Sequence, residues 1–487
     1  MSLTTASPSI DRPELRLDES LRWLRRFRDA IRVHHPELCA LASEEIGKPR
    51  FEAQMADILP LLASCRWHLA NGKRLLRPRR VRGGGLLGLG TRFERHRVPV
   101  GRVLIIATWN YPVQLLGIQL VQAVLAGNEV VVKPSERAPR TQARLVELAV
   151  AAARGLPRVE GRISIRSASR EEGRRVLAEE RFDHVVFTGS TAVGRAIAEV
   201  CAARLIPSTL ELSGSDSAIV FADADLAAAA RAVFMGVTAN AGQTCMAPRR
   251  VIVAREVEQA FLQELAKLFA GAAPRALVDA RAAEETAAVV AEAIAAGGVS
   301  IAATFEGARG RELRPVAVRE CPVESRLFRG EHFGPALAIR TFESELEAYA
   351  LHVRAGQHLA TTIWTRRPAR HRDAALALGG AALVHFNSVL MPSAHPGVAI
   401  VGRGRSGWGA SRGESGLLAL THEVCVTRSS TLFAPPVGEP DARAQRFLAR
   451  MLSFPLRPAE PASPAKAPES NPEQPVARRD DRTGIHA

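Results

Sequence analysis

The sequence contains little lysine. Five of its 65 basic residues are lysine (48, 73, 133, 267 and 466), and the rest are arginine. The formal net charge is +15, a balance that is compatible with binding to nucleic acid or to an anionic membrane. The positive charge is, however, spread along the chain and not gathered in one patch. We therefore attribute it to an arginine-rich composition and expect no nucleic-acid partner.

Three further absences narrow the class of protein. The six cysteines are widely spaced and include no Cys-x-x-Cys pair, which argues against a disulfide framework and a zinc site and favours a reducing compartment. No run of about 18 uninterrupted apolar residues occurs, so no membrane span is expected. The first residues lack a basic stretch followed by an apolar one, so no signal peptide is expected. We expect a cytoplasmic protein without a metal site.

The stretch from Leu21 to His34 has a helical period, with large apolar residues on one side and five arginines between them. Such a helix can lie on a membrane. A surface helix that packs one face against a core is the more common arrangement and is the one we expect. Peripheral membrane contact is left open without being predicted.

Short apolar runs alternate with helical stretches from Gly101 onward. The expected strands include 103–106, 130–132, 162–165, 184–187 and 209–212. This alternation predicts an α/β fold with a doubly wound, nucleotide-binding sheet. The alternation continues with longer helices from about 216 to 405, which predicts a second α/β domain.

We expect four parts along the chain. They are a cofactor-binding domain over 1–215, a catalytic domain over 216–410, a return segment over 411–434, and a disordered proline-rich tail over 435–487. Ten of the 30 prolines fall in that tail, a composition typical of disorder. Within the tail, 446–454 is a candidate for a short helix.

Two segments match the spelling Gly-x-Gly-x-x-Gly, at 83–88 and 402–407. In dinucleotide-binding folds this pattern follows a strand and opens a helix, so that the phosphate meets a helix N-terminus. Neither segment follows an apolar strand run. We expect turn or loop glycines at both.

One cysteine stands apart from the others. Cys245 lies in the stretch Ala239 to Pro248, among small residues and ahead of a strand-like run. Glu211 lies at the end of another short strand, before Ser213 and Gly214. A thiol and a carboxylate on two strand ends are candidates for a nucleophile and a general base.

The motifs together resemble the aldehyde dehydrogenase superfamily over roughly residues 20–430. Each block is weak alone, and their order and spacing carry the resemblance. The blocks are Thr108-Trp-Asn-Tyr-Pro112, Gly127 to Glu136, Phe187-Thr-Gly-Ser-Thr-Ala-Val-Gly194, Leu210 to Gly214, Gly242-Gln-Thr-Cys245, Glu331-His-Phe-Gly-Pro335 and Asn387.

The resemblance implies roles for three catalytic residues. Cys245 would add to an aldehyde carbonyl and form a thiohemiacetal that surrenders hydride. Asn110 would donate a hydrogen bond to the developing oxyanion, together with the Cys245 backbone N–H. Glu211 would activate the water that hydrolyses the thioester, which favours a free acid as product over acyl-CoA.

The resemblance also implies a nicotinamide dinucleotide as hydride acceptor. Lys133 and Glu136 would hold the adenosine ribose, and a carboxylate there favours NAD, with NADP left open. Glu331 would bind the nicotinamide-side ribose. The further cofactor-binding residues on these blocks are Trp109, Ser135, Gly189, Ser190, Gly194 and Phe333.

The chain departs from the family pattern in three places. The usual Leu-Gly-Gly-Lys after the glutamate reads Leu212-Ser-Gly-Ser215, position 330 is glycine where a glutamate is frequent, and the late Pro-Phe-Gly-Gly block reads Ala399-Ile-Val-Gly402. None of these changes touches the thiol, the base or the oxyanion donor. The C-terminal block 402–418 is similar to a bacterial branch that includes diapolycopene-dialdehyde dehydrogenases, which oxidise long apolar aldehydes.

We therefore expect an NAD(P)-dependent aldehyde dehydrogenase that acts on an apolar aldehyde. A CoA-acylating aldehyde dehydrogenase and a non-catalytic binding or scaffold protein are the alternatives. The family also implies a homodimer or homotetramer, with strands at about 91–98 and 423–428 pairing between subunits.

Overall fold

The computed structural model describes residues 13–82, 90–377, 381–430 and 441–453. The described residues belong to two compact units, one formed by 13–82 and 93–427 and the other by 90–92, 428–430 and 441–453. No helix among these residues has the length and apolar character needed to span a bilayer.

The first sheet of the larger unit has six strands in the order β18-β7-β6-β3-β4-β5. Its strands are β3 (Arg102–Ile106), β4 (Glu129–Lys133), β5 (Ile163–Ile165), β6 (His184–Gly189), β7 (Ser208–Leu212) and β18 (Gly407–Trp408). All neighbours are parallel except β18, which runs antiparallel to β7. The chain builds outward from β3 through β4 and β5 and then returns to β6 on the other side. This reversal creates the crevice in which doubly wound folds bind nucleotides.

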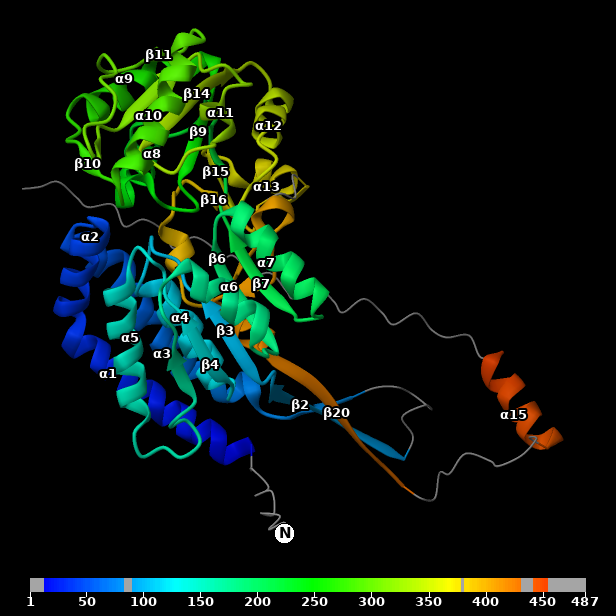
Figure 1. Ribbon diagram of the computed structural model, residues 1–487. Helices are drawn as coiled ribbons and strands as arrows, with labels where there is room; N and C mark the ends of the chain where they lie inside the picture. The colour runs from blue at the N-terminus through cyan, green and yellow to red at the C-terminus, as the bar shows by residue number, and fades with distance from the viewer. Residues whose placement is uncertain (1–12, 83–89, 378–380, 431–440, 454–487) are drawn as a thin grey trace, which may run out of the picture. The chain divides into compact units, whose positions relative to one another are not determined.

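Helices cover both faces of this sheet (Figure 1). They are α1 (Pro13–Ile46), α2 (Arg50–Ala53), the π-helical turn η1 (Gln54–Ile58), α3 (Leu59–Leu76), α4 (Gln114–Leu125), α5 (Pro139–Ala153), α6 (Arg170–Glu179) and α7 (Thr191–Ala203). Alternating strand residues serve the two faces, as the pleat requires. Val103 and Ile105 pack in the core with α1 and α3–α5, whereas Leu104 packs in the core with α6 and α7.

The helix expected near residues 21–34 is part of α1. Its apolar stripe (Trp23, Leu24, Phe27 and Ile31) is fully buried, and the Trp23 indole N–H donates to the Ala149 carbonyl in α5 at 2.8 Å. The stripe therefore packs against the core, as predicted.

The second sheet has seven strands in the order β11-β13-β14-β9-β8-β15-β16. They are β8 (Asp216–Val220), β9 (Pro248–Ala254), β11 (Val299–Ser300), β13 (Val316–Arg319), β14 (Ala336–Phe342), β15 (Ala360–Trp364) and β16 (Leu383–Phe386). Only β11 is antiparallel to its neighbour. The flanking helices are α8 (Leu226–Thr238), η3 (Ala239–Gly242), η4 (Arg255–Val257), α9 (Glu258–Ala270), α10 (Ala280–Ala295), α11 (Arg326–Arg329), α12 (Glu345–Val353) and α13 (Pro368–Ala377).

Smaller elements complete the larger unit. They are the pair β10 (Arg275–Ala276) and β12 (Glu312–Leu313), the pair β17 (Ile400–Val401) and β19 (Ala410–Ser411), the turns η5 (Met391–Ala394) and η6 (Gly404–Ser406), and α14 (Gly413–Ala419). A three-stranded sheet joins β1 (Arg79–Val81), β2 (Thr91–Pro99) and β20 (Thr421–Ser429) in that order. The two strands expected to form an oligomerisation arm are thus β2 and β20, and they are neighbours within one chain. Their pairing between subunits stays a prediction.

In the smaller unit, α15 (Ala442–Leu452) occupies the position at which a short helix was expected. The rest of the proline-rich tail and the glycines at 83–88 lie outside the described residues. The second glycine-rich segment contains η6 and the first residue of β18. Its glycines therefore lie in and beside a short turn and do not open an α-helix, as predicted.

Together the two sheets and the small β arm confirm the predicted fold class, an α/β chain with a doubly wound sheet, a second α/β sheet and an added β element. The domain boundaries stay a prediction. One detail was not anticipated: β18, at residues 407–408, returns from the C-terminal part of the chain to the edge of the first sheet.

Candidate active site

The three predicted catalytic residues line one cavity of about 560 Å³. Asn110 follows β3, Glu211 lies in β7 one residue before its end, and Cys245 lies three residues before β9. The carboxyl-terminal ends of β3 and β7, in the first sheet, therefore lie near the amino-terminal end of β9, in the second sheet.

An unusual turn directs the loop that carries Cys245. Asn240 (φ 51°), Ala241 (φ 54°) and Gly242 (φ 72°) are consecutive residues in the left-handed region. A Cβ at Gly242 would lie 2.4 Å from the Gly334 carbonyl group, so only glycine fits there. The next residue, Gln243, is buried and fastens the loop. Its side-chain amide donates to the Asn240 carbonyl at 3.0 Å, and its side-chain oxygen accepts from the Val278 N–H at 2.9 Å.

The Cys245 thiol is held in its neutral form. Burial, followed by the nearby charge of Glu211, raises its pKa to about 12, against the opposing charges of Arg412 and Arg249. The thiolate is the nucleophilic form of cysteine. A role as nucleophile would therefore require the thiol to lose its proton.

Glu211 keeps one carboxylate oxygen available. The Ser411 hydroxyl donates to Oε2 at 2.6 Å, whereas Oε1 is buried and has no partner among the described residues. The side chain is 3% exposed. A buried carboxylate oxygen without a partner is costly in a folded protein and suggests a functional use.

Hydrogen bonds at both the oxygen and the nitrogen of the Asn110 side chain fix its orientation. The Thr108 hydroxyl donates to its oxygen at 3.1 Å, and its Nδ2 donates to the Gln243 carbonyl at 3.1 Å. Because the oxygen accepts from Thr108, the NH₂ group points toward the loop that carries Cys245. An amide NH₂ has two N–H groups, and the second can serve as an oxyanion donor.

Five predicted cofactor residues line the same cavity: Trp109, Gly189, Ser190, Glu331 and Phe333. The rings of Trp109 and Phe333 meet edge to face with centroids 5.8 Å apart. Ser190 caps α7, since its hydroxyl oxygen accepts from the Val193 N–H. Gly194 lies within α7, where a Cβ would be 2.4 Å from the Leu212 side chain. Glycine here lets α7 pack close to the sheet, as in dinucleotide-binding folds.

Four predicted cofactor residues do not line this cavity: Gly194, in α7, and Lys133, Ser135 and Glu136. The last three form a separate group. They lie at and just beyond the carboxyl end of β4, where Lys133 Nζ is 3.7 Å from Glu136 Oε2 and Arg170 Nε is 2.8 Å from Glu136 Oε1. Although burial opposes it, hydrogen bonds and these cations hold the pKa of Glu136 below its usual value. The site fits a dinucleotide: a polar cavity beside a helix N-terminus, with a carboxylate and an ammonium on the neighbouring strand.

A second cavity, of about 510 Å³, approaches Cys245 from another direction. Much of its lining is large and apolar, including Phe51, Met55, Leu59, Met235 and Met391, all of which are exposed. Cys245 and Leu115 line both cavities. The thiol thus lies where the polar and the apolar cavity meet.

Several residues of the site were not found from the sequence. The Ser411 hydroxyl donates a hydrogen bond to Glu211. Arg412 (φ 66°) donates to the Ser393 carbonyl at 3.1 Å, and its charge opposes the rise in the Cys245 pKa. Both lie more than 150 residues from Cys245 along the chain, and no local pattern marks them. Lys48 forms an ion pair with Asp57 and donates a hydrogen bond to the Asn110 backbone carbonyl. The one signal for Lys48 was the scarcity of lysine.

Comparison with known proteins agrees with this geometry. The aldehyde dehydrogenase family matches residues 13–426. The chain is 30% identical over 421 residues to 4,4'-diapolycopene aldehyde oxidase of Methylomonas sp, covering 84% of this chain and 78% of that protein. It is 29% identical over 416 residues to 4,4'-diapolycopene-4,4'-dial dehydrogenase of Cytobacillus firmus, covering 84% and 89%. The solved structure of PnpE in complex with nicotinamide adenine dinucleotide has a TM-score of 0.79 at 26% identity, covering 86% of this chain and 87% of that one. The structure of PnpE from Pseudomonas sp. WBC-3 has a TM-score of 0.79 at 25% identity, covering 87% and 88%.

The family match spans both sheets and includes the cavity that holds Cys245, Glu211 and Asn110. The chain therefore belongs to the aldehyde dehydrogenase family, as its motifs predicted.

Proposed function

We propose that this chain oxidises an apolar aldehyde to a carboxylic acid through a covalent adduct on Cys245, with NAD(P) as hydride acceptor. The observation that supports this most is the place of Cys245. The thiol lies where a polar cavity and an apolar cavity meet, and Asn110 and Glu211 line the polar one.

Catalysis begins with the thiol. The Cys245 thiol gives its proton to water as the sulfur adds to the aldehyde carbonyl carbon, and the carbonyl oxygen gains negative charge. The free N–H of Asn110 and the Cys245 backbone N–H stabilise this oxyanion, a type of interaction commonly worth about 10²- to 10³-fold in kcat. Their positions are set before substrate arrives, because Thr108 and Gln243 already orient the amide.

The cofactor, when bound, accepts the hydride. Trp109, Glu331 and Phe333 would surround its nicotinamide half, and Gly189 and Ser190 would lie near its pyrophosphate at the start of α7. Lys133, Ser135 and Glu136 would hold its adenosine half, with Gly194 allowing α7 to approach. Glu136 favours NAD because a carboxylate accepts ribose hydroxyls and repels a 2′-phosphate, and NADP remains an alternative.

Glu211 acts after the hydride has left. Its unpartnered oxygen takes a proton from a water molecule, which attacks the thioester and releases the acid. The hydroxyl of Ser411 holds the other oxygen and so fixes the orientation of the carboxylate. This arrangement supports hydrolysis over transfer of the acyl group to CoA, and the intact triplet of functional groups argues against a non-catalytic scaffold.

The apolar cavity supports an apolar substrate. An aliphatic chain that extends from the thiol through this cavity would contact Met246, Met235 and Phe51. Each buried CH₂ group contributes about 0.8 kcal/mol, so binding should strengthen as the aldehyde chain lengthens.

The first prediction concerns the nucleophile and the substrate together. The wild-type enzyme should form NADH from aldehyde without CoA, with kcat/KM at least about tenfold higher for decanal than for acetaldehyde. Cys245→Ala should show no turnover, whereas Cys425→Ala, at an exposed cysteine, should retain wild-type turnover. Equal kcat/KM for the two aldehydes would contradict the apolar substrate. Activity only with added CoA would support the acylating alternative.

The second prediction concerns Glu211. In Glu211→Gln the thioester forms but is not hydrolysed, because the amide cannot accept a proton from water. We expect a rapid burst of about one NADH per active site, followed by a steady rate lower by about 10²-fold or more. Stopped-flow absorbance measures both phases. Loss of the burst along with the steady rate would show that Glu211 acts before hydride transfer.

The third prediction concerns pH. Since burial and Glu211 raise the thiol pKa to about 12, the thiolate fraction grows about tenfold per pH unit below that value. Inactivation of the cofactor-free enzyme by iodoacetamide should therefore rise from about pH 7 to about pH 10 without a plateau. Glu211→Gln removes a like charge, so its inactivation should be faster at each pH. A plateau in the wild type near neutral pH would contradict this picture.

The fourth prediction concerns assembly, for which we propose a homodimer or homotetramer. Strand β20 lies at the edge of its sheet, and Val424 and Val426 are 42% and 50% exposed. Open edge strands readily pair with another chain. Sedimentation should show an oligomer that dissociates in Val424→Lys/Val426→Lys but not in Val33→Lys, which changes an exposed valine of α1. A wild-type monomer would overturn the proposal.

A further inference from the structure

A buried ion pair contacts the backbone of the predicted oxyanion donor, Asn110. Lys48 Nζ is 2.6 Å from Asp57 Oδ2, and neither side chain is exposed. The ammonium also donates to the Asn110 carbonyl at 2.7 Å and lies 3.9 Å from the centre of the Tyr111 ring. Lys48 is one of only five lysines, and its ammonium contacts two consecutive residues of the active-site loop.

Asp57 holds the other end of the same loop. Its Oδ1 accepts hydrogen bonds from the backbone N–H groups of Val113 and Gln114, both at 3.1 Å. These groups belong to the start of α4, where backbone donors lack partners within the helix. The ion pair thus forms hydrogen bonds with the loop backbone at two places, Asn110 and residues 113–114.

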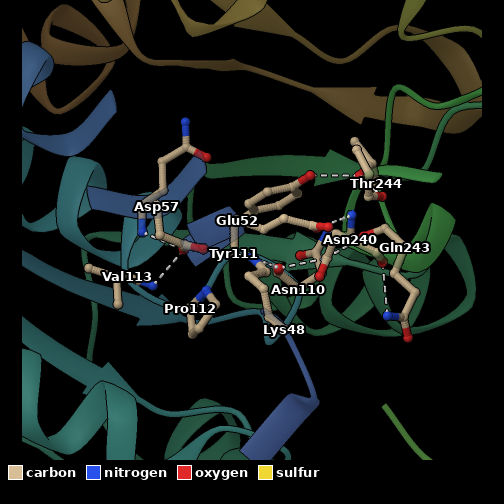
Figure 2. Close-up of polar contacts among 12 residues, drawn as sticks. Lys48, Glu52, Asp57, Asn110, Tyr111, Pro112, Val113, Asn240, Gln243 and Thr244 are labelled. Carbon is tan, nitrogen blue, oxygen red and sulfur yellow. Dashed lines mark hydrogen bonds and ion pairs between the residues drawn. The ribbon is translucent and has the colours of Figure 1, made fainter. Parts of the chain in front are cut away.

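The loop in turn contacts the segment that carries the nucleophile (Figure 2). Asn240 Nδ2 donates to the carbonyls of both Asn110 and Gln243, at 2.9 and 3.1 Å. The Tyr111 and Thr244 hydroxyls are 2.6 Å apart. A shift of the Asn110 backbone would therefore change the distance between its amide and Cys245.

The charges around Lys48 affect its pKa. Burial lowers the Lys48 pKa, whereas Asp57, Glu52 and Cys39 oppose that shift. Glu52 is itself engaged, because its carboxylate accepts from the Asn240 N–H at 2.8 Å and from Arg275 at 3.2 Å. A buried ion pair is seldom more stabilising than apolar side chains of the same size. Its distinctive property is that it fixes the positions of the groups that it binds.

We propose that Lys48 and Asp57 are positioning residues that act on catalysis through Asn110. They hold the 110–114 backbone so that the Asn110 amide faces the carbonyl oxygen of a substrate bound to Cys245. This inference rests on the proposed function, since it assigns the oxyanion role to Asn110. Neither residue contacts the reacting atoms, although Lys48 lines the apolar cavity. A change in that cavity alone would alter the KM for decanal, whereas the effect on kcat should pass through the asparagine.

The test is a double-mutant cycle measured on the full chain with NAD and decanal. The primary change is Lys48→Met/Asp57→Asn, which removes both charges and leaves no uncompensated buried ion. Lys48→Met alone is the second variant. Each is made in the wild type and in Asn110→Ala. Trp23→Phe, which removes a buried hydrogen bond in the same core, is the control for loss of stability alone.

We expect Asn110→Ala to lower kcat by about 10²- to 10³-fold. The double variant should lower kcat at least about tenfold in the wild-type background while the KM for NAD changes less than about twofold. In the Asn110→Ala background the same change should lower kcat less than about twofold, because the group through which it acts is gone. Trp23→Phe should lower the melting temperature without changing kcat.

Other outcomes overturn the inference. Equal losses in the two backgrounds would show that the pair stabilises the fold independently of Asn110, and so would a variant that melts earlier with unchanged kcat. If the double variant does not fold, the same comparison applies to Lys48→Met. No turnover in the wild type with either aldehyde would overturn the proposed function and this inference with it, whereas turnover with additive losses would overturn the inference alone.

Discussion

The close approach of the 239–247 loop to the end of the first sheet is the constraint on which the site depends. The loop turns through three consecutive left-handed residues, two of which are not glycine. That conformation costs about 1–2 kcal/mol for each such residue. Three kinds of hydrogen bond offset this cost. Asn240 donates to two carbonyls, Gln243 donates to the Asn240 carbonyl, and the Val278 N–H donates to the Gln243 side-chain oxygen. The turn places Cys245 in the same cavity as Asn110 and Glu211, which lie at the ends of strands of the first sheet.

The position of the 239–247 loop also places Cys245 between two cavities with different linings. On one side of the thiol most lining residues are polar, among them Glu211, Glu331 and Ser190, the N-cap of α7, and the Trp109–Phe333 pair lies with them. On the other side it is mostly apolar, with methionines and leucines near the surface. In the proposed reaction, the aldehyde carbon bound to the thiol must meet the dinucleotide. A thiol at the junction of the two cavities would let each ligand enter from its own side.

Two departures from the family pattern turn out to be related. Gly330 has φ 69°, and a Cβ there would lie 2.1 Å from the Ser215 hydroxyl oxygen. Ser215 donates to the Arg329 carbonyl at 2.7 Å and accepts from Arg250 at 2.9 Å. A glutamate at position 330 would clash with this arrangement. The serine and the glycine therefore depend on each other, and their effect lies beside Glu331 and not at the thiol.

The sequence alone determined the fold class, the family and the identity of the predicted nucleophile, base and oxyanion donor. Those follow from short motifs and from strand–helix alternation, which are local in the chain. Only the tertiary structure decided which oxygen of Glu211 is free, because Ser411 reaches it from 200 residues away. It likewise decided that Lys133, Ser135 and Glu136 lie apart from the cavity and that Lys48 and Asp57 lie beneath Asn110. Such contacts join segments distant in the chain, and no local spacing or periodicity encodes them.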